Sequence, residues 1–100
     1  MDKIELDIPL ENIADICKRH DVSELSVFGS SVTGGYGEDS DVDLLVQFVP
    51  ESRIGFIEFS KIGRELSEAI GRKVDLVPKN GLKPAVREDV LAHAKVIYAR

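Results

Sequence analysis

Several residue types that mark particular classes of protein are scarce in this chain of 100 residues. Cys17 is the only cysteine, so an internal disulfide is impossible and a disulfide-stapled scaffold is excluded. The chain also lacks a Cys/His cluster of the kind that holds zinc. Apolar runs never exceed five residues, whereas a membrane-spanning helix needs about 20. Because residues 1–5 are polar and acidic, we expect no secretory leader and a cytoplasmic protein.

The chain also has no excess of basic residues. It contains 13 Lys and Arg and 18 Asp and Glu, which gives a net charge of −5. A protein that holds duplex nucleic acid through its phosphates shows the opposite balance. The composition therefore disfavours stable binding to duplex nucleic acid and favours a chelated metal or a protein partner. With 43% hydrophobic and 31% charged residues, the chain is expected to fold as one domain over residues 1–100.

The spacing of apolar residues predicts an α/β (α+β) fold with two layers. Apolar residues recur every three or four positions in the helical segments, and Gly71 is suited to end the longest helix. We expect a small mixed sheet with helices mainly on one of its faces. Helices are predicted over residues 9–20, 53–70 and 84–92, and strands over 24–28, 42–49, 73–77 and 96–99. The long helix should bury a stripe of Phe56, Phe59, Ile62, Leu66, Ala69 and Ile70.

Three aspartates on two predicted strands form the main candidate site. Asp41 and Asp43 lie two residues apart at the start of a strand, so both carboxylates point to the same side. Two like charges this close repel each other unless a cation lies between them, and hard oxygen ligands suit Mg²⁺. Asp75 lies in the next strand and completes the cluster if the two strands are neighbours. Three carboxylates can hold one or two metal ions or leave Asp75 to accept a proton.

The turn at Gly29 and Ser30 supplies a candidate phosphate site. Glycine lets the backbone approach a phosphate closely, and N–H groups of such a turn can point at the anion. The hydroxyl of Ser30 adds another donor. Together with the aspartates, this turn is typical of a site for a nucleoside triphosphate.

Other phosphate and cation motifs do not fit the spacing. Gly35 and Tyr36 stand where a phosphate-binding loop requires Lys and Ser or Thr. The aspartates that start at Asp39 look like the opening of a calcium loop, but Leu44 replaces its glycine and Pro50 its closing glutamate.

With Gly29-Ser30, Asp41-Val42-Asp43 and Asp75 in this order, the sequence resembles the nucleotidyltransferase superfamily that includes DNA polymerase β. It is most similar to the minimal nucleotidyltransferases (the MntA-like branch), over roughly residues 23–98. The resemblance implies that Asp41 and Asp43 bind Mg²⁺, that Asp75 assists the acceptor and can join the metal site, and that Gly29 and Ser30 hold the phosphates of ATP. It also implies an antitoxin that moves AMP from ATP onto a tyrosine hydroxyl of a HEPN-family toxin.

One position departs from the family pattern, because Thr33 stands where many members carry Arg or Lys. Either Lys79, Lys83 or Arg87 then supplies the missing positive charge, or ATP binds weakly. Two alternatives remain open: transfer to a small-molecule hydroxyl such as that of an aminoglycoside, and an antitoxin that acts by contact alone. A domain this small must also hide its sheet edge, which leaves room for a homodimer or hetero-oligomer.

Overall fold

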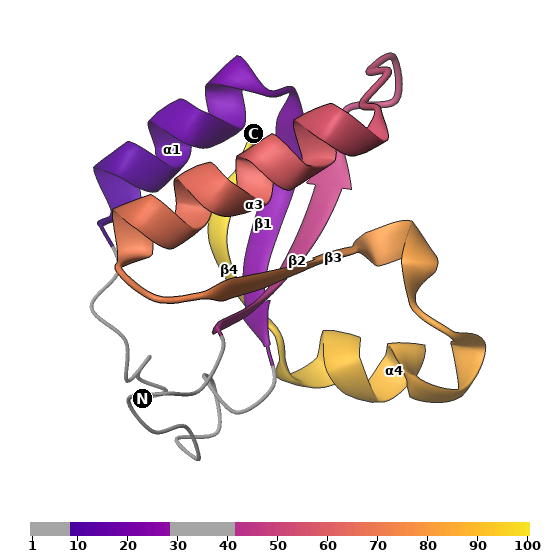
Figure 1. The fold of residues 1–100 in the computed structure, drawn as a ribbon. Coiled ribbons are helices and arrows are strands. Elements are labelled where there is room, and N and C mark those ends of the chain that lie inside the picture. The colour runs from indigo at the N-terminus through magenta and orange to yellow at the C-terminus, as the bar shows by residue number, and fades with distance from the viewer. Residues whose placement is uncertain (1–8, 29–41) are drawn as a thin grey trace.

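The computed structural model describes residues 9–28 and 42–100, which form a mixed four-stranded sheet with helices (Figure 1). The strand order is β3-β2-β1-β4; β1 is antiparallel to both β2 and β4, whereas β2 and β3 are parallel. The α+β fold and the four strands are therefore as predicted, to within two residues at each end. The strands are β1 (Val22–Phe28), β2 (Val42–Phe48), β3 (Val74–Pro78) and β4 (Lys95–Ala99).

Two helices, α1 (Leu10–Arg19) and α3 (Phe56–Ile70), contact each other and cover the same face of the sheet (Figure 1). A short 3₁₀ helix, η1 (Lys79–Gly81), follows β3, and α4 (Pro84–His93) then leads back to β4. Figure 1 shows α4 apart from the other two helices, and none of its residues is buried. Within the described part of the chain, no helix has the length and apolar character needed to cross a membrane.

The helix α3 begins three residues later than the sequence predicted. Gly55 is extended, with φ −85° and ψ 176°, and its carbonyl accepts the N–H of Phe59 at 2.9 Å. The end of the helix was predicted correctly, since Gly71 has a left-handed φ of 79° and donates its N–H to the Ser67 carbonyl at 2.8 Å. Glycine adopts this conformation without the steric penalty of a Cβ atom.

The hydrophobic core lies between the helix pair and the sheet. The stripe predicted on α3 is buried at Ile62 and Leu66, but the prediction was wrong for Phe56, which is 84% exposed. Phe56 belongs to the first turn of the helix and lies outside the core cluster. The fully buried side chains of the core are Ile13, Cys17, Val22, Leu25, Val27, Val42, Leu44, Val46, Ile62 and Leu66.

His20 joins α1 to α3 at the edge of this core. Its side chain is 9% exposed, and its two ring nitrogens lie 3.0 Å from Glu58 Oε2 and 3.2 Å from Glu65 Oε1. Arg19 Nη2 adds a second contact to Glu65 Oε1 at 3.2 Å. These partners give His20 a structural role in holding the two helices together.

Cys17 should resist thiol reagents in the folded protein. Burial raises the pKa of its thiol from 9.0 to about 12, so the reactive thiolate is strongly depleted. At pH 8 we expect Ellman's reagent to label the native protein at least about 100-fold more slowly than the protein in guanidinium. The raised pKa also makes the free energy of unfolding depend on pH. The contribution of Cys17 to stability is fully present below pH 9 and is lost as the pH rises towards 12. Equal labelling rates in the native and the denatured protein would contradict the expected protection of Cys17. The variant Cys17→Ala, which has no thiol, measures the background reaction of the reagent.

Candidate functional site

Two of the predicted site residues, Asp43 and Asp75, are direct partners on neighbouring strands. Asp43 is the second residue of β2 and Asp75 the second residue of β3, and the parallel register pairs them. Neighbouring strands lie about 4.8 Å apart, and paired residues point to the same face. The core residues Val42 and Leu44 flank Asp43 on the other face, so both aspartates face away from the helix pair. Asp43 is half-buried, whereas Asp75 is exposed.

The end of β1 lies beside this pair of aspartates. Phe28, the last residue of β1, pairs with Asp43 in the antiparallel register. The last described residue before Gly29 is therefore a direct neighbour of Asp43. Gly29, Ser30 and Asp41 themselves lie outside the described residues, so their predicted roles stay predictions.

The chemistry of the aspartate pair fits a hard divalent cation. Both groups are carboxylates on one face of the sheet, and a cation relieves their mutual repulsion. Residues 9–28 and 42–100 contain no cluster of three metal-ligating side chains, because the predicted third ligand, Asp41, lies outside them. The described part of the site thus supplies two oxygen-bearing side chains for Mg²⁺.

Among the basic residues expected to supply a positive charge in place of one at Thr33, Lys79 lies at the far end of β3 from Asp75. Thr33 lies outside the described residues, so a compensating role of Lys79, Lys83 or Arg87 stays a prediction. Lys79 follows the last residue of β3, four residues beyond Asp75, and its Nζ lies 3.0 Å from Glu24 Oε1. Arg87 donates to the Lys79 carbonyl at 3.3 Å. Four residues of extended chain cover about 13 Å, so the Lys79 backbone lies well away from the aspartates. Lys83 comes after η1 and immediately before α4, which leads the chain back to β4.

A basic residue that the sequence analysis overlooked lies closer to the site. Lys73 immediately precedes β3, and its carbonyl accepts the N–H of Val42 at 2.8 Å. Because it stands two residues before Asp75, the alternation of an extended chain places it on the same side of the sheet. Side chains alternate between the two faces of a strand, and this alternation could have identified Lys73 from the sequence as a basic residue on the same face as Asp75.

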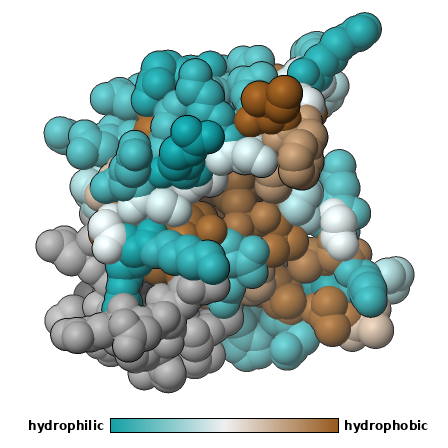
Figure 2. Space-filling model, in the orientation of Figure 1, coloured by the Kyte–Doolittle hydropathy of each residue, from teal (hydrophilic) through white to brown (hydrophobic). Residues whose placement is uncertain are grey.

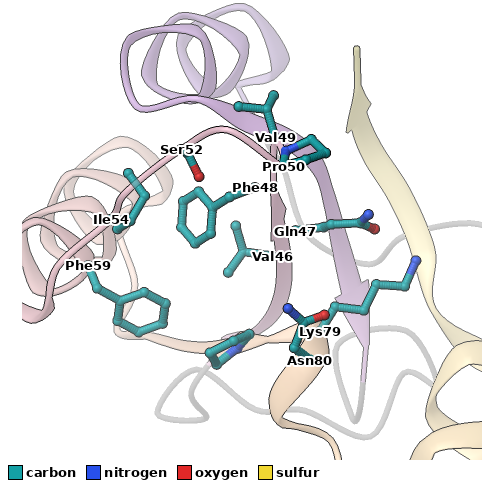
Figure 3. Close-up of a pocket in the computed structure, with 11 residues that line it drawn as sticks. Val46, Gln47, Phe48, Val49, Pro50, Ser52, Ile54, Phe59, Lys79 and Asn80 are labelled. Carbon is teal, nitrogen blue, oxygen red and sulfur yellow. The ribbon is translucent and has the colours of Figure 1, made fainter.

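A pocket of the described structure lies at the opposite end of β2 from Asp43. Figure 3 shows the side chains that line it. It has a volume of about 500 Å³ and lies between the start of α3 and η1. Its lining is mixed, with apolar side chains beside the polar Gln47, Ser52, Lys79 and Asn80, and it includes no member of the predicted catalytic set. The aspartate pair is the better candidate for the chemistry, because the pocket contains no carboxylate that could hold a cation.

Comparison with known proteins identifies the family of the chain. Residues 10–97 match the family described as the nucleotidyltransferase domain. The protein adenylyltransferase MntA of Thermococcus cleftensis is 39% identical over 84 residues, which are 84% of this chain and 81% of the relative.

Solved structures share the fold. A structure assigned as a minimal nucleotidyltransferase is 36% identical, with a TM-score of 0.72 and 85% of each chain covered. A second match, at 18% identity and a TM-score of 0.66, is the complex of a tri-AMPylated HEPN toxin with an MNT antitoxin from Shewanella oneidensis. That match covers 91% of this chain and 70% of the other.

Proposed function

This chain belongs to the nucleotidyltransferase family, and we propose that it transfers AMP from ATP to a tyrosine hydroxyl of a HEPN toxin and so acts as an antitoxin. The observation that carries the proposal is the direct pairing of Asp43 with Asp75 beside the end of β1. The relative from Thermococcus cleftensis is named as a protein adenylyltransferase, which supports a protein acceptor. We place the activity in the cytoplasm, where ATP is available.

In the proposed reaction the acceptor oxygen forms a bond to the α-phosphorus of ATP, and the bond from that phosphorus to the bridging oxygen breaks. Pyrophosphate leaves with the electron pair, and the proton of the hydroxyl passes to Asp75. Gly29 and Ser30 hold the β- and γ-phosphates. Asp41 and Asp43, with Asp75, would hold one or two Mg²⁺ ions, which stabilise negative charge on the transferring phosphate when bound.

The acceptor is proposed to be a protein because the 39% identical relative from Thermococcus cleftensis is named as a protein adenylyltransferase. The complex of an AMPylated HEPN toxin with an MNT antitoxin provides a precedent for such a pair. A small-molecule hydroxyl, such as that of an aminoglycoside, remains the second candidate.

Transfer of labelled nucleotide to a HEPN protein encoded by a neighbouring gene tests the proposal. We expect label from α-³²P-ATP to appear on the toxin with Mg²⁺ and no label from γ-³²P-ATP, because adenylyl transfer keeps only the α-phosphate. Mass spectrometry should locate the AMP on tyrosine, and EDTA should abolish transfer. Label on an aminoglycoside instead of the toxin would favour the second candidate. Suppression of the toxin without any label would indicate an antitoxin that acts by contact alone.

A further inference from the structure

The start of α3 exposes two large apolar side chains next to the pocket at the end of β2. Phe56 and Ile57 are each 84% exposed. Phe59, one turn after Phe56 on the same side of the helix, lines the pocket. Figure 2 shows brown side chains at the start of α3 and in the hollow below it. Large apolar side chains that are exposed side by side next to a hollow are typical of an interaction site.

The pocket is lined by residues of β2, the loop that follows it, α3, β3 and η1 (Figure 3). Phe48 and Phe59 contact each other edge to face, with ring centroids 6.4 Å apart. Ile54 and Pro78 add to the apolar wall, and Lys79 is held at the rim by its ion pair with Glu24. A hollow of about 500 Å³ can accept one or two large side chains of a partner.

The charge beside this surface differs from that of the whole chain. Residues 79–87 contain Lys79, Lys83 and Arg87 and no acidic residue, although the protein carries a net charge of −5. Glu24 neutralises Lys79, whereas Lys83 and Arg87 are exposed. Glu88 and Asp89 follow Arg87 on α4, so the positive charge is confined to η1 and the start of α4. A partly apolar hollow with a positive border on this side is complementary to an apolar surface that carries acidic side chains along one flank.

We propose that Phe56, Ile57 and the pocket form a docking surface for an amphipathic helix of the acceptor protein that has acidic residues along its flank. This inference rests on the proposed function for the identity of the acceptor. The exposed Phe56 and Ile57 extend the apolar surface beyond the pocket, so a small ligand would leave it uncovered. A helix laid in the hollow covers both parts at once.

Docking at this surface separates binding of the acceptor from the chemistry. The pocket begins at Val46, three residues beyond Asp43, and extends past the end of β2. At about 3.3 Å per residue, its centre lies on the order of 15 Å from the aspartates. The surface therefore anchors the acceptor while a different part of it presents the hydroxyl.

The experiment compares a docking variant with a matched control, with a purified HEPN protein encoded by a neighbouring gene as the probe. In the double variant Phe56→Ser and Ile57→Ser, calorimetry should show affinity for this protein reduced by at least about 30-fold. In AMP transfer, KM for the toxin should rise with kcat nearly unchanged, while ATP affinity stays as in the wild type. The control Leu10→Ser removes an apolar side chain that is 55% exposed on α1 and should change neither value.

Two charge-reversal variants test whether the basic side chains beside the pocket contribute to binding of the HEPN protein. Lys83→Glu should weaken binding about 5- to 10-fold at low salt, whereas Lys18→Glu on α1 should have little effect. Unchanged affinity of the double variant, or no binding of the HEPN protein by the wild type, would overturn the docking surface. A wild-type dimer that the double variant splits would assign the surface to a second copy instead. Toxin binding without AMP transfer would overturn the proposed function alone.

Discussion

Replacing Asp43 with Asn is expected to lower kcat/KM for AMP transfer by on the order of 10³-fold. Asp43 pairs with both Phe28 on β1 and Asp75 on β3, so it occupies the centre of the site between three strands. The substitution keeps the size of the side chain and removes the negative charge that we propose holds the cation. Transfer of label from α-³²P-ATP to the HEPN toxin measures the loss, and the melting temperature should shift by only a few degrees.

Two further variants show whether the loss belongs to the site. Asp75→Asn should lower kcat about 10²- to 10³-fold, because a proton acceptor usually contributes that much. Asp15→Asn makes the same chemical change at an exposed position on α1 and should leave the rate within about 2-fold of the wild type. If Asp43→Asn retained most of the activity in a folded protein, the aspartate pair would not be the catalytic centre.

The position of these aspartates could be predicted because strand alternation and motif spacing are local properties. The sequence showed Asp43 and Asp75 on two strands, and it required only that the strands be neighbours. The parallel pairing of β2 with β3 meets that condition. By contrast, the strand order β3-β2-β1-β4 depends on contacts between distant segments and has no local signal.

The distance between Lys79 and Asp75 has a geometric cause. Lys79 is close to Asp75 in sequence, but an extended strand moves the chain about 3.3 Å per residue, so four residues reach the other end of a five-residue strand. Lys73 is closer in space because it belongs to the same side and the same end of β3. Proximity in sequence is therefore a poor guide to proximity along a strand.

Phe56 shows where periodicity alone misleads. It has the spacing of a core residue, yet the helix begins at Phe56 and its first turn lies outside the core cluster. The sequence pattern cannot show whether another element covers the end of a helix. The same limit applies to α4, whose apolar residues do not produce a buried face.

Replacing Ile62 with Ala should destabilise the fold by about 3 kcal/mol, the second large effect that we expect. Ile62 is fully buried where α3 packs on the sheet, and truncation leaves a cavity that the surrounding core cannot fill. For a domain of this size, the loss corresponds to a fall in melting temperature of about 15 °C. Thermal denaturation followed by circular dichroism measures it.

Ile57 provides a matched control on the same helix. It is 84% exposed, so Ile57→Ala removes the same atoms from a surface position and should change stability by no more than about 0.5 kcal/mol. Because both changes replace Ile by Ala within α3, the gain in helix propensity cancels between them. Equal melting temperatures for the two variants would show that α3 does not pack on the sheet through Ile62. A stable Ile57→Ala protein that binds the HEPN toxin weakly would separate the surface that recognises the partner from the core that holds the site.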